Sequence, residues 1–260
     1  PGWHIECSAM STCCLGDTFD IHGGGSDLIF PHHENEIAQS EGATGKEFAR
    51  VWIHNGPLRI DNEKMSKSLN SFFTIRDVLV DYPPEVIRYF LVSSHYRSPV
   101  NYSTDNLKQA YSALARLYNA LKGLDHEGVA PAEATEFESR FQAAMEDDFN
   151  TPEALSVLFD LARELNRLKL EDETDSMPMA ALLVKLGNIL GVMQQAPEEF
   201  LQEGGEGVDP AYVDELISRR NQARSDKNWQ LADEIRDELK ALNVILEDKD
   251  GQTGWRIERD

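Results

Sequence analysis

Hydrophobic and polar residues follow one pattern in the first hundred positions and another beyond them. In the first part, short apolar runs stand between glycines, prolines and histidines, as at Phe19–His22 and Val51–His54. Runs of this length, bounded by turn residues, predict strands. A break at 23–25 follows the first run, and Pro31 suits the first turn of a helix. Strand, loop and helix in this order predict an α/β layer with a partly parallel sheet.

From Thr104 to Met193, apolar residues recur at every third or fourth position, which is the period of an amphipathic helix. Thr104 is a good N-cap for the first helical segment. Asn150 and Thr151 open the second, and the third spans Ala180–Met193. Apolar stripes with this period are by default the core of a helical bundle.

The last fifty residues follow a polar, glycine-rich stretch. Their pattern predicts two helices, over Tyr212–Arg224 and Trp229–Leu242, and then a β-hairpin whose strands lie at 244–247 and 255–257. We therefore expect the following division: a domain over 1–100, a helical domain over 101–201, a linker over 202–209 and a domain over 210–260.

Composition limits the class of protein. The chain has 260 residues, of which 41% are hydrophobic and 27% charged, as in ordinary globular proteins of two or three domains. No run approaches the ~20 apolar residues of a membrane span, and we expect neither a membrane anchor nor a signal peptide. Cys7, Cys13 and Cys14 cannot form a disulfide scaffold, which favours the reducing cytoplasm.

The net charge of −21 excludes a generally basic surface for nucleic acid. A local basic run remains, formed by Arg219, Arg220, Arg224 and Lys227. Charge alone favours a solvated helix face for this run.

Three residues near the start have the chemistry of a zinc site. His32 and Glu36 are four positions apart and share one face of a helix, and Cys7 supplies a thiolate. Three protein ligands leave one position open, as in a catalytic zinc site. Rival ligands are His33, Glu34, Cys13 and Cys14, and a polar helix start explains the pattern equally well.

Two further motifs suit a nucleotide. In Lys64-Met-Ser-Lys-Ser68, two lysines flanked by hydroxyls can neutralise a polyphosphate. In His22-Gly-Gly-Gly-Ser-Asp27, glycines after a strand allow close approach to a ligand, and the acid can hold ribose hydroxyls. A tight turn is the simpler reading of the second motif.

Lys64-Met-Ser-Lys-Ser68 is the signature of class I aminoacyl-tRNA synthetases. Together with Gly2–Ser8 and His22–Glu36, it resembles one branch of that class, the cysteinyl-tRNA synthetases. The resemblance continues along the chain at Arg76-Asp77, Arg88–Leu91, Asp147–Pro152 and Lys227–Arg236.

The resemblance implies a fold and an activity. The fold is α/β, the second half of a class I Rossmann-type catalytic domain, followed by an α-helical bundle and a small mixed α+β C-terminal domain. The activity is the ligation of cysteine to tRNA(Cys) through cysteinyl-adenylate, with ATP and magnesium as substrate and one zinc ion that binds the cysteine thiol. We expect a monomer.

The resemblance also implies residue roles. The matching residues are, for zinc, Cys7, His32 and Glu36; for the cysteine substrate, Trp3 and His22; for ATP, Gly24, Gly25, Asp27, His54, Gly56 and Lys67; for catalysis on the phosphates, Lys64 and Lys67; and for the tRNA anticodon, Arg224, Trp229, Asp233 and Asp248.

The family's first nucleotide-binding half, with its His-Ile-Gly-His signature and a further zinc ligand, has no counterpart in these 260 residues. We therefore expect the chain to be part of the enzyme, to expose a sheet edge and an apolar face, and to form no adenylate alone. Two alternatives are a cysteine ligase of thiol biosynthesis and a tRNA-binding module without catalysis. The motif around Trp229 and the terminal hairpin disfavour the first, and the set Cys7, His32 and Glu36 disfavours the second.

Overall fold

The computed structural model describes residues 2–60, 63–64, 74–126, 128–133, 135–171, 173–202, 209–249 and 252–257. The chain forms two compact units. The first consists of Pro1–Phe72 and Ser94–Ser103, and the second of Phe73–Ser93 and Thr104–Asp260. The last fifty residues group with the bundle in this division, so the three predicted domains stay a prediction.

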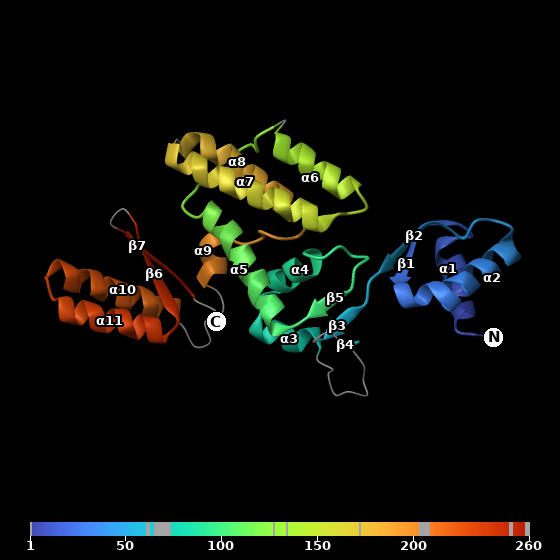
Figure 1. Cartoon of the computed structure of the whole chain (residues 1–260), viewed down its shortest axis with the longest axis horizontal. Helices are drawn as coiled ribbons and strands as arrows, with labels where there is room; N and C mark the ends of the chain where they lie inside the picture. Colours follow the sequence, from blue (N-terminus) through green and yellow to red (C-terminus); the bar gives the residue numbers. More distant parts are fainter. Residues whose placement is uncertain are drawn as a thin grey trace. The chain divides into compact units, whose positions relative to one another are not determined.

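The described residues of the first unit form two small sheets, two α-helices and two short helical segments (Figure 1). Its elements are α1 (His4–Leu15), β1 (Phe19–Gly25), η1 (Ser26–Leu28), η2 (Ile29–His33), α2 (Glu34–Thr44), β2 (Ala49–Asn55), β3 (Leu58–Ile60), β4 (Glu63–Lys64) and β5 (Val100–Tyr102).

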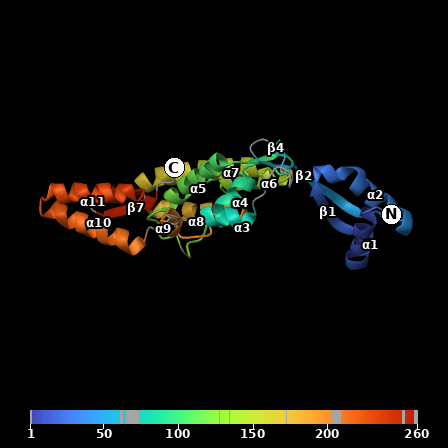
Figure 2. The ribbon, with the colours of Figure 1, turned by 90° about the horizontal axis from the view of Figure 1, so that it is seen from below.

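Strands β1 and β2 pair in parallel, from Phe19 opposite Ala49 to Gly25 opposite Asn55. The predicted strands and the order strand, loop, helix are therefore confirmed, although α2 begins three residues after Pro31. Helices α1 and α2 pack against each other (Figure 2). Helix α1 was not among the predicted elements.

The predicted break at 23–25 is wrong, because β1 continues to Gly25. Glycine here serves close packing rather than a turn. A Cβ atom on Gly24 would lie 2.8 Å from Cε1 of His33 and 3.0 Å from Cδ1 of Leu28. The backbone of Gly25 is extended, with φ −69° and ψ 151°. The glycines therefore bring the β1 backbone close to the histidine of the next element.

The first residues of this parallel sheet are buried, whereas an apolar pair further along it is exposed. Phe19, Phe48 and Ala49 form a small buried cluster with Trp52 packed against it. On the strands themselves, Ile21 and Val51 are register partners, and they are 61% and 48% exposed. The expected apolar exposure is therefore seen at Ile21 and Val51.

The second sheet has the strand order β4-β3-β5, with β3 antiparallel to β4 and parallel to β5. Gly56, just before β3, requires the absence of a side chain, since a Cβ atom there would lie 2.1 Å from the Ser98 carbonyl oxygen. Lys64 lies in β4, opposite Arg59. Lys67 lies outside the described residues.

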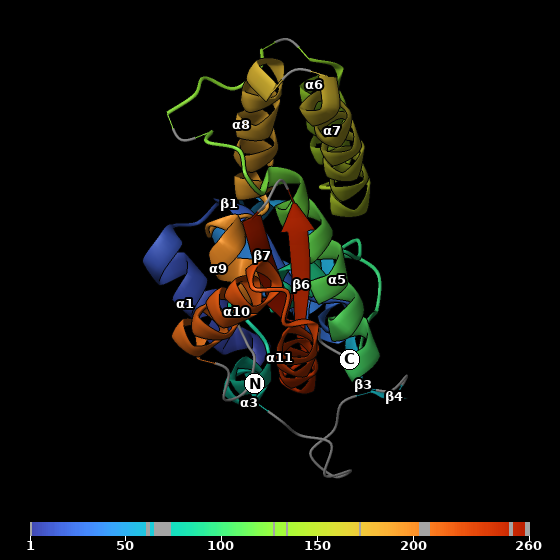
Figure 3. The same ribbon diagram turned by 90° about the vertical axis from the view of Figure 1, so that its left-hand side faces the viewer.

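The second unit is helical up to residue 202. Its helices are α3 (Ile75–Asp81), α4 (Pro84–Val92), α5 (Thr104–Leu121), α6 (Glu136–Glu146), α7 (Thr151–Glu171), α8 (Glu173–Ile189) and α9 (Pro197–Gln202). Helices α6, α7 and α8 lie side by side (Figure 3). Buried leucines of α5, α7 and α8 confirm the predicted bundle core: Leu114, Leu117, Leu158, Leu161, Leu165 and Leu182. Helix α8 ends before the predicted Met193, because Gly191 and Met193 adopt φ values of +71° and +63°.

A buried carboxylate joins three parts of this unit. Glu85 of α4 is 5% exposed. The Tyr118 hydroxyl of α5 lies 3.0 and 2.8 Å from its two oxygens, and the Met193 N–H donates to Oε1 at 2.5 Å. The Gln195 N–H donates to the Tyr118 hydroxyl at 3.3 Å. The network ties α4, α5 and the segment after α8 together.

The last fifty residues form α10 (Pro210–Ser225), α11 (Trp229–Ala241), β6 (Val244–Lys249) and β7 (Gln252–Ile257). The predicted helices and the antiparallel hairpin are confirmed, with Val244 opposite Ile257. Their core consists of Val213, Leu216, Ile217, Ile235, Leu239, Val244, Trp255 and Ile257. Among the helices of the described part, none has the length and apolar character that crossing a membrane requires.

Candidate functional site

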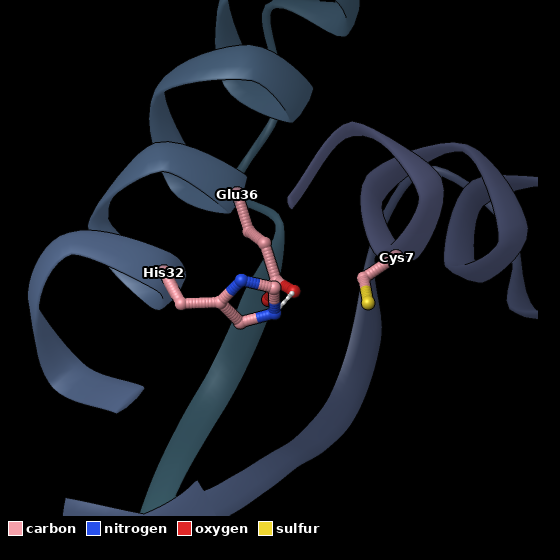
Figure 4. Close-up of side chains that lie close together, drawn as sticks. All are labelled: Cys7, His32 and Glu36. Atoms are coloured by element: carbon pink, nitrogen blue, oxygen red, sulfur yellow. Dashed lines mark ion pairs between the residues drawn. The ribbon is translucent and has the colours of Figure 1, made fainter. Parts of the chain in front are cut away.

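The predicted zinc ligands come together in the first unit (Figure 4). Cys7 projects from α1, His32 from η2 and Glu36 from the first turn of α2. One ligand atom from each lies within 4.8 Å of the other two. His32 Nε2 is 2.8 Å from Glu36 Oε1. The fold thus gathers a thiol from α1, an imidazole from η2 and a carboxylate from α2.

A second group shares the same carboxylate. His22, His33 and Glu36 also place their ligand atoms within 4.8 Å of one another. His22 Nε2 lies 2.8 Å from Glu36 Oε2, and His33 Nδ1 lies 2.8 Å from His54 Nε2. Glu36 is therefore the centre of a cluster of histidines.

The state of Glu36 bears on a bound cation. The side chain is 1% exposed. His22 and His32 lie at hydrogen-bond distance, but neither contact has hydrogen-bond geometry, and both Glu36 oxygens are without a hydrogen-bond partner among the described residues. A buried anion in this state is costly unless a positive charge compensates it. The donor set of Cys7, His32 and Glu36 therefore fits a borderline-soft cation such as zinc.

Burial and neighbouring charges shift the pKa values of two groups in the cluster. Burial and the negative charge of Glu36 raise the pKa of the Cys7 thiol. Burial also lowers the pKa of His33, to which the neighbouring His22 and His54 contribute, against the opposing effect of Glu36. A cation bound here would instead favour the thiolate of Cys7 and the neutral form of the imidazoles.

The rival ligands differ in position. Cys13 and Cys14 lie on the exposed part of α1, and Cys7 is half-buried. Among the described residues, neither they nor Glu34 belong to a group with metal-ligand spacing. His33 does belong to one, through Glu36. Trp3 lies beside the cluster, 75% exposed, with its ring centroid 5.8 Å from that of His32.

The residues expected at ATP, apart from Lys67, which is not described, lie near the carboxyl ends of β1 and β2. Gly24 pairs with His54 in the parallel register, and Asp27 follows in η1. Gly56 comes directly after β2. Ligands of open α/β sheets bind at this end of the strands. The arrangement is thus compatible with the expected nucleotide pocket.

Two of the residues expected at the anticodon, Arg224 and Asp248, are in contact. Arg224, at the end of α10, places a guanidinium nitrogen 3.1 Å from Asp248 Oδ2 in β6. Trp229 is the first residue of α11 and 60% exposed, and Asp233 follows one turn later. Asp233 pairs with Arg236 at 3.4 Å.

Sequence reasoning missed two contacts. Arg220 was seen only as one member of a basic run, yet it is buried and forms a double contact with Asp248. His22 was assigned to the substrate, yet its ring lies against the second oxygen of Glu36. The only sequence signals were the basic run itself and the histidine that precedes the three glycines.

Three family models match the chain in order along it. They are "tRNA synthetases class I (C) catalytic domain" over residues 1–112, "DALR domain" over 140–194 and "Cysteinyl-tRNA ligase anticodon binding domain" over 210–256. A protein of Pseudomonas fluorescens (strain SBW25) named "Cysteine--tRNA ligase" is 63% identical over 258 residues, 99% of this chain and 55% of the relative. The chain belongs to the cysteinyl-tRNA synthetase family.

Other relatives have the same name and the same extent. "Cysteine--tRNA ligase" of Pseudomonas aeruginosa (strain LESB58) is 62% identical over 258 residues, 99% of this chain and 56% of the relative. The matched region of these cysteinyl-tRNA synthetases is thus a little over half of their length.

A solved structure has a similar fold. It is the crystal structure of the ternary complex of Agrobacterium radiobacter K84 agnB2 LeuRS-tRNA-LeuAMS, with a TM-score of 0.57 and 18% identity. The similarity covers 70% of this chain and 26% of the other. It supports a class I synthetase fold for this member of the cysteinyl-tRNA synthetase family.

Proposed function

We propose that the chain works as part of a cysteine–tRNA ligase. In this reaction, cysteine and ATP give cysteinyl-adenylate and pyrophosphate, and the cysteinyl group then passes to tRNA(Cys). The observation that carries the proposal is the cluster of Cys7, His32 and the buried Glu36, whose oxygens have no hydrogen-bond partner among the described residues, in a chain that also matches an anticodon-binding domain.

Zinc is the metal that this donor set suits, held by Cys7, His32 and Glu36. When bound, zinc would supply a Lewis acid that favours the thiolate of the cysteine substrate over the hydroxyl of serine. Cys7 contributes the soft ligand, and Glu36 contributes the negative charge. His22 Nε2 lies 2.8 Å from the second Glu36 oxygen. Trp3, which lies beside His32, would pack against the substrate side chain.

The nucleotide half of the pocket would use the ends of β1 and β2. Gly24 and Gly25 let the backbone approach the adenosine, with His54 and Gly56 on the neighbouring strand end. Asp27 would accept hydrogen bonds from the ribose hydroxyls. These assignments rest on the family resemblance and on the compatible positions of the residues at one sheet edge.

Activation requires no general base, because the cysteine carboxylate is already an anion. Its oxygen attacks the α-phosphorus of ATP, and the bond from that phosphorus to pyrophosphate breaks as the new bond forms. Lys64 and Lys67, together with the magnesium that accompanies ATP, would neutralise the charge that develops on the leaving phosphates. The 3′ end of tRNA(Cys) then accepts the cysteinyl group from the adenylate, with release of AMP.

The anticodon of tRNA(Cys) would bind to the last fifty residues. An exposed indole such as Trp229 can stack on an unpaired base, and Arg224, Asp233 and Asp248 can read base edges. The match of residues 210–256 to an anticodon-binding domain favours this function over a cysteine ligase of thiol biosynthesis. A cytoplasmic monomer belongs to the same proposal.

The test is cysteine-dependent exchange of pyrophosphate into ATP, followed by cysteinylation of tRNA(Cys), with the protein that carries this chain at its natural length. We expect exchange with cysteine and not with serine. Cys7→Ser should abolish it, whereas the matched change Cys13→Ser, on the same helix but exposed, should leave it intact. Equal exchange with serine, or full activity in Cys7→Ser, would overturn the proposal.

A further inference from the structure

A buried arginine, Arg220, contacts the carboxylate of Asp248, which is expected to read the anticodon. Arg220 lies on the inner side of α10, and its side chain is 10% exposed. Its two terminal nitrogens donate to the two oxygens of Asp248, at 3.2 and 3.0 Å. This double contact fixes the plane of the carboxylate as well as its position.

Two other donors complete the surroundings of Asp248. The Thr253 hydroxyl lies 2.7 Å from Oδ1, and the Arg224 guanidinium lies 3.1 Å from Oδ2. Thr253 Oγ1 also lies 3.3 Å from Asn221 Oδ1, but its single proton serves the shorter contact. Each carboxylate oxygen therefore receives two donors.

This count uses the whole acceptor capacity of the group. An ionised carboxylate offers about four lone-pair sites and no donor. Arg220, Thr253 and Arg224 together occupy four. The same donors, with Arg220 first, hold the pKa of Asp248 well below its usual range, so the group stays ionised. A nucleobase can thus bind to Asp248 only through an N–H group and only if it displaces one of the present donors.

The exposure of the two arginine side chains indicates which of them a nucleobase can displace from Asp248. The Arg220 side chain is 10% exposed and that of Arg224 is 46% exposed. Arg224 can turn into water or toward an RNA phosphate at little cost, whereas Arg220 cannot leave without an unpaired charge in the interior.

We propose that Arg220 is a positioning residue that fixes the Asp248 carboxylate, so that an N–H group of an unpaired nucleobase takes over the one acceptor position that Arg224 occupies in the RNA-free chain. The inference rests on the proposed binding of the anticodon to this domain. In this account, Arg220 stays bound to Asp248 when RNA binds, and Arg224 is displaced by the nucleobase.

The experiment measures the affinity of the chain for tRNA(Cys) and for transcripts in which each anticodon base is replaced in turn. The variants are Arg220→Met, Arg220→Lys and, as matched control, Arg219→Met at the exposed neighbouring position. The same variants are repeated in an Asp248→Asn background. Tryptophan fluorescence, to which the buried Trp255 contributes, is compared with that of the parent chain to check that each variant is folded. Arg220→Lys carries the test if Arg220→Met does not fold.

We expect Arg220→Met to weaken binding of tRNA(Cys) by about tenfold. The ratio of the affinity for tRNA(Cys) to the affinity for at least one of the replaced transcripts should fall by a similar factor. Arg220→Lys should give an intermediate effect, and Arg219→Met should keep the discrimination. In the Asp248→Asn background, the Arg220 variants should cause no further loss of discrimination, because Arg220 acts through Asp248.

Two results would overturn the inference alone. One is a folded Arg220 variant that discriminates as the parent chain does. The other is a loss of discrimination that is equally large with and without Asp248. A parent chain that does not prefer tRNA(Cys) to other tRNAs would instead overturn the proposed binding on which the inference rests.

Discussion

The buried network around Glu85 gives a stability prediction that can be calculated from the contacts. Tyr118→Phe removes a hydroxyl that contacts both Glu85 oxygens and accepts from the Gln195 N–H. The ring itself is fully buried and stacks on Phe200 at a centroid distance of 4.2 Å, and phenylalanine keeps this packing. The change therefore isolates the hydrogen bonds from the hydrophobic contribution.

The expected loss of unfolding free energy follows from the buried groups that Tyr118→Phe leaves without a hydrogen-bond partner. Glu85 keeps the Met193 N–H at 2.5 Å and the Gln194 N–H at 3.4 Å, but it loses its hydroxyl donor, and the Gln195 N–H loses its acceptor. Buried hydrogen bonds to carboxylates and orphaned buried groups each cost on the order of 1–3 kcal/mol. We expect Tyr118→Phe to lower the free energy of unfolding by ~2–3 kcal/mol.

The assay is urea unfolding followed by far-ultraviolet circular dichroism, which reports the helices of residues 75–202. Tyr212→Phe is the matched control, because the Tyr212 hydroxyl also contacts a carboxylate, that of Glu238, but on the surface. Water replaces the lost bond there, so its midpoint should hardly move. A Tyr118→Phe variant no less stable than the Tyr212→Phe variant would refute the reasoning.

Two further predictions concern alkaline pH and the close approach at Gly56. Burial raises the pKa of Tyr118, and it raises the pKa of Tyr89 to about 12. Since both folded-state pKa values lie above the ordinary value of 10, their contribution to stability is complete below pH 10 and is lost as pH rises beyond it. The urea midpoint of the parent chain should fall as pH rises from 9 to 12, and that of Tyr118→Phe should fall less steeply. Equal slopes of midpoint against pH in the two proteins would contradict this. Gly56→Ala should destabilise the first unit by ~1–3 kcal/mol, because its Cβ atom would overlap the Ser98 carbonyl. Gly42→Ala, where nothing lies within 4 Å of the added Cβ atom, should stabilise α2 by ~0.5–1 kcal/mol. Tryptophan fluorescence in a urea titration, to which Trp52 of the first unit contributes, measures both changes. If the two glycine changes altered the free energy of unfolding equally, the close contact between Gly56 and Ser98 would be refuted.

The parts of the fold that the sequence predicted are those with a clear local period. Helices α5 and α7 bury one stripe each, and the terminal hairpin alternates around a turn. Helix α1 has no such stripe, and its apolar residues Ile5, Met10 and Leu15 are 44%, 57% and 61% exposed. Periodicity therefore gave no signal for the helix that carries Cys7.

The site was only partly predictable for a similar reason. The spacing of His32 and Glu36 follows from helix geometry, but the choice of Cys7 over Cys13 and Cys14 came from the family resemblance. The position of His22 against Glu36 depends on the register of β1 with β2, and the burial of Arg220 depends on where Asp248 returns in the hairpin. Both are long-range contacts, which local pattern does not encode.

The most direct test of the cysteine pocket is the zinc content of the purified chain after dialysis against metal-free buffer. The account predicts close to one zinc ion per chain, retained in the double variant Cys13→Ser/Cys14→Ser and lost in Cys7→Ser. A chain that binds no zinc, or that loses zinc only when Cys13 and Cys14 are replaced, would contradict the assignment of Cys7, His32 and Glu36 as the metal ligands.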